Sequence, residues 1–556
     1  MQKVIPLIIS LMLLIPAFAL DTNEWVEIYA PAVAQTEEGL VGALSAMRIR
    51  IESGDGHVFV DTFPLTEMDM QSSARMAASV ACSVSNKKMN DYDFFVVVRG
   101  DSQLVGGTSA GGAMTVAMIA ALKNLTLKKN VMMTGTISPD GSIGPVSGIP
   151  QKMEAAKSVG TKTFLIPKGQ ANYTYMETTS RQIGPLVITS QSPVEMNLVD
   201  YGKKMGISVK EVSNVREAVE EFTGVKLERL ESTAINTQEY ARIMKSQAEK
   251  LEKDARNSYT KAQAVNSPEL RNYTNESYKR IRDGLNFMSQ GRYYTASSSF
   301  FESLIYSSYV INYRNFSANP ESALKSVGAA LEKTDTEIRN GTTLYNVLYI
   351  QCSGAAEEKI IEAKNSFERA YNMTQKGSIA DFVFELCYAM ERAKSAEWWL
   401  EVSRSVQAEA AALSEEYVSS MALSAMNTAQ ESLIYAQFSA SSELAPVLLE
   451  ANSLLNEANT ATKNGYIAGS IVLASKAQAL SDLVTELGAR GADESSVNIA
   501  RENAMSAIAR TQSSGVEPIL ALAYYEYAES YESANAISAL MNYKYAESIA
   551  RMSGVA

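Results

Sequence analysis

The segment Val105-Gly-Gly-Thr-Ser-Ala-Gly-Gly112 places one serine, Ser109, among four glycines and directly before an apolar helical run. Glycines let the backbone adopt positive φ values and approach a substrate carbonyl closely. The N-terminus of a helix also offers unpaired N–H groups that can bind a developing oxyanion. The segment therefore indicates a nucleophilic serine, with a glycine-rich turn that merely leads into a helix as the structural alternative.

Short apolar runs around this segment predict a domain of mixed strands and helices, α/β or α+β, over residues 22–225. The strand-like runs are rich in β-branched and aromatic side chains and are bounded by Gly, Asp, Asn or Pro. The helical runs have apolar or small residues at helical spacing. The predicted elements are strands at 57–60, 94–98 and 163–166, and helices at 68–81 and from Ser109 onward.

Residues 226–556 are almost wholly helical in character, so we place a domain boundary near residue 225. A chain of 556 residues is in any case too long for one hydrophobic core. After each of three turn glycines a helical pattern restarts around a small residue, at 294–296, 378–380 and 466–468. This pattern predicts an all-α region of helical hairpins. Repetition of one hairpin and chance similarity among Ala-rich helices both explain the three restarts.

Composition excludes several classes of function. The formal net charge is −12 with a pI near 5.0 and no basic stripe, which argues against nucleic-acid binding. The three cysteines form no C-x-x-C pair, so neither a zinc site nor a disulfide framework is indicated. We expect Cys82, Cys352 and Cys387 to be buried small hydrophobes, with a bridge between the last two as the one conceivable disulfide. We expect no metal and no cofactor.

The N-terminus has the pattern of a signal peptide. Lys3 is followed by an uncharged apolar run over residues 4–19 that ends in Ala17-Phe-Ala19, an A-x-A cleavage site. We therefore expect export, with the protein extracellular or on the outer face of the cytoplasmic membrane. If residues 4–19 are not removed, they could instead associate the protein with the membrane.

A nucleophilic serine needs a base, and the choice of base is limited. Gly107-x-Ser109-x-Gly111 also fits the nucleophile elbow of α/β-hydrolases, whose histidine follows the serine in sequence. The chain has a single histidine, His57, which precedes Ser109. An esterase or amidase that uses His57 stays an alternative, although a partly exposed strand histidine is the simpler interpretation. A desolvated lysine can take the place of histidine.

Such a lysine lies in a second segment, which runs from Met133-Thr-Gly135 to residue 156. Lys152 follows Pro150 in the first turn of a predicted helix. If its side chain points inward, burial disfavours the charged ammonium form and lowers the pKa. A solvated surface charge is the structural alternative for a lysine at this place.

These segments resemble, in order and spacing, the peptidase domain of Lon proteases. The resemblance covers about residues 40–215, and the separation of 43 residues between Ser109 and Lys152 matches the family's spacing. The family's motifs are a serine in a P-S-A-G or D-S-A-type turn, a strand ending in M-T-G, a G-G-x-x-x-K helix start, a closing strand of the type T-V-L-I-P and a helix of the type V-M-K-E-S-A. Their counterparts lie at Gly107-Thr-Ser-Ala-Gly111, Met133-Thr-Gly135, Gly148-Ile-Pro-Gln-Lys152, Thr163-Phe-Leu-Ile-Pro167 and residues 68–78.

The resemblance implies roles for single residues. Ser109 would attack the scissile carbonyl, Lys152 would act as general base and then general acid, and Thr134 would hydrogen-bond the lysine. The supporting residues that flank the serine are Gly107, Thr108 and Ala110. The chain departs from the family pattern in three ways: the acidic residue just before the serine and the upstream histidines are absent, and the glutamate of M-T-G-E is replaced by threonine.

The chain contains no G-x-x-x-x-G-K-[ST] phosphate loop. The sequence thus predicts an exported, ATP-independent serine endopeptidase that cleaves peptides or unfolded proteins. The resemblance further implies a homo-oligomeric ring, and it is closest to archaeal exported or membrane-associated Lon-like proteins. A catalytically silent protein that keeps the fold and binds partners through its helical region is the alternative from another class.

Overall fold

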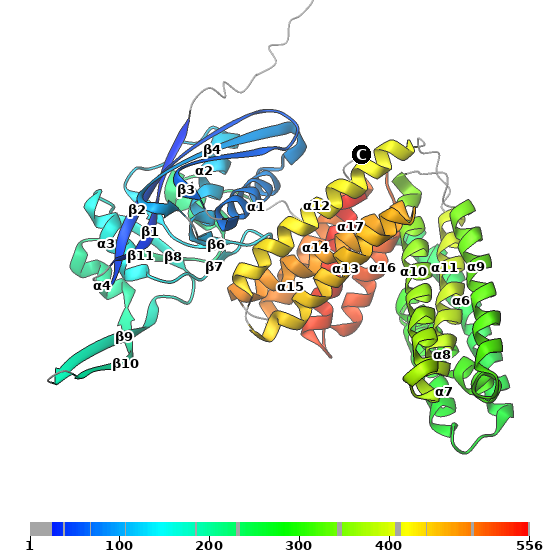
Figure 1. Cartoon of the computed structure of the whole chain (residues 1–556). Coiled ribbons are helices and arrows are strands. Elements are labelled where there is room, and N and C mark those ends of the chain that lie inside the picture. Colours follow the sequence, from blue (N-terminus) through cyan, green and yellow to red (C-terminus); the bar gives the residue numbers. More distant parts are fainter. Residues whose placement is uncertain are drawn as a thin grey trace, which may run out of the picture. The chain divides into compact units, whose positions relative to one another are not determined.

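The structure is a computed structural model that describes residues 25–36, 39–66, 68–105, 107–183, 186–228, 234–341, 347–405, 413–440, 442–490 and 494–553. The predicted signal segment, residues 1–19, lies outside this range. The chain divides into an N-terminal unit, Met1–Ile137 with Gly141–Leu227, and a helical unit, Ser138–Asp140 with Glu228–Ala556. Figure 1 shows the strands gathered in the first unit and only helices in the second.

A four-stranded sheet forms one half of the N-terminal unit, with the strand order β1-β2-β4-β3. Its inward side chains alternate along the strands, as Met47, Ile49 and Ile51 do in β2, and they pack on α1 and α2. The element bounds are β1 (Val26–Thr36), β2 (Gly39–Ser53), β3 (Val58–Thr66), β4 (Tyr92–Val105), α1 (Met68–Ser85) and α2 (Gly111–Lys123).

A second, parallel sheet forms the other half, in the order β11-β8-β5. Its central strand, β8, is buried almost throughout, as expected for a parallel strand covered on both faces. The strands are β5 (Val131–Met133), β8 (Thr163–Pro167) and β11 (Ser208–Val212), and the neighbouring helices are α3 (Ile149–Ser158), α4 (Leu198–Met205) and α5 (Val215–Thr223). The strands and helices predicted near 57–60, 68–81, 94–98 and 163–166 are all present.

Two further strand pairs complete this unit. The short strands β6 (Thr136–Ile137) and β7 (Ile143–Gly144) pair antiparallel beside the second sheet. The long hairpin of β9 (Asn172–Ile183) and β10 (Leu186–Asn197) projects from the unit (Figure 1). This hairpin was not predicted from the sequence.

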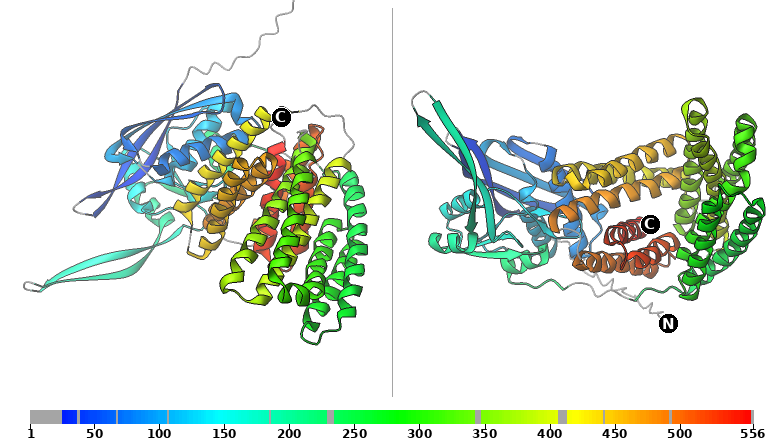
Figure 2. Two further views of the ribbon diagram at one scale, coloured as in Figure 1. Left: turned by 45° about the vertical axis from the view of Figure 1, so that its right-hand side comes forward. Right: turned by 90° about the horizontal axis from the view of Figure 1, so that it is seen from below.

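The helical unit consists of long helices, some of which pack against the next helix in sequence and others against the next but one. Gly291, Gly377 and Gly465 each lie between two helices that contact each other: α7 with α8, α10 with α11, and α13 with α14. The views in Figure 2 show these antiparallel pairs. The bounds are α6 (Gln238–Val265), α7 (Arg271–Ser289), α8 (Tyr293–Ala318), α9 (Pro320–Gly341), α10 (Val347–Lys376), α11 (Ile379–Ser405), α12 (Glu415–Ser439), α13 (Ala445–Lys463), α14 (Ile467–Arg490), α15 (Glu494–Ser513), α16 (Ile519–Tyr531) and α17 (Ala536–Ser553).

The predicted helix restarts are confirmed, since α8, α11 and α14 begin directly after the three glycines. The fold class, an α+β domain followed by an all-α region of helical hairpins, is confirmed as well. The window Ile467–Gly488 is long and apolar enough to cross a membrane, but 83% of it is buried, as in the core helix of a globular domain. All three cysteines are buried and free, as expected of small hydrophobes.

Candidate active site

The segment that carries Ser109 turns sharply into a helix. Gly107 has a φ of 96° and stands at the N-cap of the short helix η2 (Thr108–Ala110), which leads directly into α2. Two following glycines are needed for close packing. A Cβ on Gly111 would lie 2.8 Å from Ile137 Cγ2, and one on Gly112 would lie 2.7 Å from a methionine methyl group. The start of α2 therefore sits directly against β5 and β6.

Backbone hydrogen bonds fix the segment that carries Ser109 on this surface. The Gly135 N–H donates to the Ser109 carbonyl oxygen (3.0 Å), and the Gly112 N–H donates to the Gly135 carbonyl oxygen (3.0 Å). Within the described part of the chain, the N–H groups of Thr108 and Ser109 have no acceptor. Ser109 itself is half-buried, and Ala110 is buried. Unpaired N–H groups at a helix start can bind a developing oxyanion.

Lys152 lies in the first turn of α3, which begins after Gly148 (φ 66°) and has a proline in its first turn. The residue is only 3% exposed. Burial disfavours the charged ammonium form and lowers the pKa of Lys152 to about 8. The structure thus places the amine inside the unit and not in solvent.

Thr134 connects the lysine with the serine segment. The Lys152 Nζ donates a hydrogen bond to Thr134 Oγ1 (3.3 Å), and Thr134 Oγ1 donates to the Ser109 carbonyl oxygen at the long distance of 3.5 Å. Thr134 is fully buried, and its own N–H donates to the Leu165 carbonyl oxygen in β8 (3.1 Å). Among the described residues, no hydrogen bond joins Lys152 Nζ to Ser109 Oγ. Such contacts are often long without substrate and tighten when it binds.

Two polar residues that support α3, the helix that carries Lys152, were not predicted from the sequence. The Gly148 N–H donates to the Tyr173 hydroxyl oxygen (2.8 Å) at the root of β9. Gln170 makes a two-way bond with Val146, accepting from its N–H (3.0 Å) and donating to its carbonyl oxygen (2.9 Å). Both residues follow β8 closely, but no spacing rule links them to a helix that precedes that strand.

A third missed residue lies beside the serine. Asp69, in the first turn of α1, accepts a hydrogen bond from the Gly107 N–H through Oδ2 (2.7 Å). An acidic residue in the first turn of a helix is common because it complements the helix dipole. The sequence around Asp69 therefore did not indicate a contact with Gly107, which lies 38 residues further along the chain.

His57 takes no part in this arrangement. Its side chain is 64% exposed, its Nδ1 lies 3.4 Å from Asp93 Oδ1, and its ring stacks with Phe59. The described contacts of His57 include neither Ser109 nor Lys152. The described residues also contain no group of three or more His, Cys, Asp or Glu side chains that could hold a metal ion.

Comparison with known proteins matches the same region. Residues 33–183 fit the family described as the Lon protease (S16) C-terminal proteolytic domain. Lon protease 1 of Myxococcus xanthus is 31% identical over 155 residues, which are 25% of this chain and 19% of that protein. The archaeal Lon protease of Pyrococcus abyssi is 24% identical over 190 residues, which are 34% of this chain and 18% of that protein. The Lon protease of Buchnera aphidicola is 36% identical over 141 residues, which are 24% of this chain and 18% of that protein. The match thus spans less than a fifth of each of these curated relatives.

Proposed function

Since residues 33–183 form a Lon-type proteolytic domain, we propose that this chain is a serine endopeptidase in which Ser109 and Lys152 form the catalytic dyad. The observation that carries the proposal is the buried amine of Lys152, whose pKa is lowered to about 8 and whose Nζ is held by Thr134. A lysine can act as general base only in its neutral form. With this pKa, about a tenth of the amine is neutral at pH 7 and about half at pH 8.

In the proposed reaction, Lys152 removes the proton of the Ser109 hydroxyl as the oxygen attacks the scissile carbonyl. The negative charge on the carbonyl oxygen is stabilised by the free N–H groups of Thr108 and Ser109. The protonated lysine then gives its proton to the leaving amine, and water hydrolyses the acyl-enzyme by the same route in reverse. The Thr134 hydroxyl keeps the amine in place in both halves of the reaction.

We further propose that the enzyme is exported and works without ATP on peptides or unfolded proteins. Export rests on the signal-peptide pattern of residues 1–19, and ATP independence rests on the absence of a phosphate-loop motif from the sequence. With no motor, a tightly folded substrate should resist cleavage. Stimulation of casein hydrolysis by ATP in the purified protein would contradict this part of the proposal.

We also propose a homo-oligomeric ring, which rests on the resemblance to Lon proteases alone. In a ring, Ser109 would face an enclosed space that admits only extended chains. Light scattering tests this proposal, and a strictly monomeric protein with full activity would contradict it. Membrane association through residues 4–19 is tested by sequencing the N-terminus of the mature protein.

A serine-directed fluorophosphonate label tests the dyad. We expect the wild type and His57→Ala to be labelled on Ser109, and Lys152→Ala to be labelled far more slowly. Labelling that depends on His57 but not on Lys152 would favour an esterase or amidase instead. No labelling of the folded wild type would favour a catalytically silent binding protein. The exposed side chain of His57 argues against the esterase alternative.

A further inference from the structure

The loop before Ser109 is held from a distant part of the chain. Asp69 Oδ2 lies 2.7 Å from the Gly107 N–H, a short distance typical of a charge-assisted hydrogen bond. The carboxylate comes from the first turn of α1, whereas residues 105–112 contain no acidic side chain of their own. Asp69 is the acidic group that holds this loop.

The burial of Asp69 is unusual for a residue that only caps a turn. It is 9% exposed, and its second oxygen, Oδ1, is buried without a hydrogen-bond partner among the described residues. Burying a carboxylate with only one oxygen satisfied costs stability, and a neutral side chain could accept the same bond at a lower cost. Natural proteins keep such unfavourable groups mainly at functional sites.

The bond acts on a backbone that must stay in one unusual conformation. Gly107 has a φ of 96° and a ψ of 139°, and these two angles direct the following peptide group, which carries the Thr108 N–H. On the other side, the Ser109 carbonyl oxygen is fixed by the Gly135 N–H (3.0 Å). Asp69 and Gly135 thus bracket a short stretch of backbone, and the two N–H groups between them, on Thr108 and Ser109, are left without an acceptor in the described part of the chain.

We propose that Asp69 is a positioning residue for the oxyanion site, which it orients by holding the Gly107 N–H from α1. The inference rests on the proposed function, since it assigns an acid that orients the same site. Asp69 does not touch the substrate. It fixes the direction in which the Thr108 and Ser109 N–H groups point, and so acts on the transition state more than on substrate binding.

Kinetics of the full chain test the role of Asp69. Removing one oxyanion donor lowers kcat by about 10²- to 10³-fold, so misdirecting these donors in Asp69→Ala should lower kcat by about 10- to 100-fold with little change in KM. Fluorophosphonate labelling of Ser109 should slow in parallel, because its phosphoryl oxygen uses the same N–H groups. Asp69→Asn keeps a carbonyl acceptor for Gly107 and should restore most of the lost kcat. The midpoint of the pH profile should stay near that of the wild type, since Lys152 is unaffected.

Asp93→Ala is the matched control. The Asp93 carboxylate also accepts backbone hydrogen bonds, from the N–H groups of Asp55 (3.0 Å) and His57 (2.9 Å), but it lies at the start of β4 in the first sheet. We expect this variant to lose thermal stability while keeping its kcat and its labelling rate. A folded Asp69→Ala protein with the kcat and labelling rate of the wild type would overturn the proposal.

If Asp69→Ala does not fold, Gly107→Ala provides the second test. A Cβ at Gly107 meets nothing within 4 Å, so this variant should fold, but alanine disfavours a φ of 96° and the loop should relax. We expect kcat to fall by about tenfold or more with KM little changed. Wild-type kcat in Gly107→Ala would overturn the proposal. Absence of serine labelling in the folded wild type would instead refute the catalytic function itself.

Discussion

In the proposed mechanism, stability and catalysis make opposite demands on Lys152. Burial lowers the pKa of its amine, which the proposed role as a base for Ser109 requires, but the same burial makes the charged form costly. The lowered pKa of about 8, against an ordinary value of 10.5, measures this cost. The lowered pKa of Lys152 therefore predicts how both activity and stability depend on pH.

The first prediction concerns activity and pH. If Lys152 is the base, the rate should rise with pH along a limb centred near its pKa of about 8, and no histidine limb near pH 6.5 should appear. Lys152→Arg keeps the charge but cannot lose its proton, so kcat should fall by at least about 100-fold. His57→Ala should stay within a few-fold of the wild type. An active Lys152→Arg protein together with an inactive His57→Ala protein would require a histidine-based mechanism.

The second prediction concerns stability. Between pH 8 and 10.5 the unfolded chain binds a proton at Lys152 that the folded chain has lost, so the free energy of unfolding rises with pH across this window. Below pH 8 the full cost of the buried ammonium remains. Lys152→Met should therefore be more stable than the wild type at pH 7, by up to about 3 kcal/mol, and the difference should shrink toward pH 10.5. Urea unfolding at both pH values measures this. A constant difference would show that the lysine is not desolvated.

At the scale of single elements, the start of α3 decides where Lys152 lies. Gly148 adopts a left-handed conformation (φ 66°), and a Cβ there would lie only 2.7 Å from Val33 Cγ1 in β1. Its N–H donates to the Tyr173 hydroxyl oxygen at the root of β9. The position of Lys152 therefore depends on a strand that precedes α3 and on one that follows it.

The third prediction follows from this packing. Gly148→Ala should be destabilised by the left-handed conformation, about 1 kcal/mol, and by a further roughly 1 to 3 kcal/mol of overpacking against Val33. The displaced helix start should also lower kcat. Gly160→Ala is the control, because Gly160 is equally left-handed (φ 81°) but a Cβ there meets nothing within 4 Å. Equal losses in the two variants, measured by urea unfolding and by kcat, would show that the contact with Val33 does not set the position of α3.

Local patterns were enough to predict some elements but not others. The glycines around Ser109 and the proline ahead of Lys152 are short-range signals, and both predicted the start of a helix at the right place. β1 was harder to predict because it is rich in alanine and contains Pro31, which is tolerated since β1 lies at the edge of its sheet.

Contacts across the chain could not be predicted from the sequence. The bond from Gly107 to Asp69 joins residues 38 positions apart, and the bond from Gly148 to Tyr173 joins residues 25 positions apart. Both depend on how the strands and helices come together, and no local spacing rule encodes that. Residues with local sequence signals are therefore predictable, whereas the residues that hold them in place depend on the tertiary fold.

At the scale of the whole molecule, the two units have separate hydrophobic cores. The buried clusters of the N-terminal unit share no residue with those of the helical unit. A change in one core should therefore leave the packing of the other largely intact, as is usual for domains with their own cores. The independence of the two cores can be tested in the helical unit, because substituting one of its buried charged side chains should destabilise that unit strongly.

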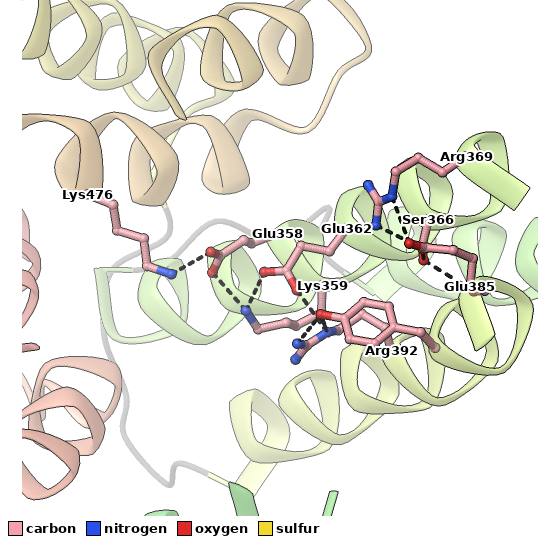
Figure 3. A network of polar contacts seen from close by, with 9 residues as sticks. Glu358, Lys359, Glu362, Ser366, Arg369, Glu385, Arg392 and Lys476 are labelled. Carbon is pink, nitrogen blue, oxygen red and sulfur yellow. Dashed lines mark hydrogen bonds and ion pairs between the residues drawn. The ribbon is translucent and has the colours of Figure 1, made fainter. Parts of the chain in front are cut away.

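Figure 3 shows this buried network, which joins α10, α11 and α14. The Lys476 Nζ lies 2.5 Å from Glu358 Oε1, and the Lys359 Nζ contacts both Glu358 Oε2 (3.4 Å) and Glu362 (2.7 Å). Arg392 contacts Glu362 from α11 (2.8 Å). Each of these charges is costly to bury alone and acceptable only because its partners are present.

The fourth prediction combines the separate cores with this network. Lys476→Met leaves Glu358 buried with one cation fewer, and breaking a buried pair in this way typically costs about 3 to 5 kcal/mol. The calorimetric transition of the helical unit should move to lower temperature, while the transition of the N-terminal unit and the kcat for a short peptide should not change. Lys250→Met is the control, because its pair with Glu401 is more than half exposed on both sides and should contribute less than about 1 kcal/mol. A clear fall in kcat together with the loss of stability in the helical unit would contradict this prediction. It would show that the two units are coupled and that the helical region takes part in catalysis.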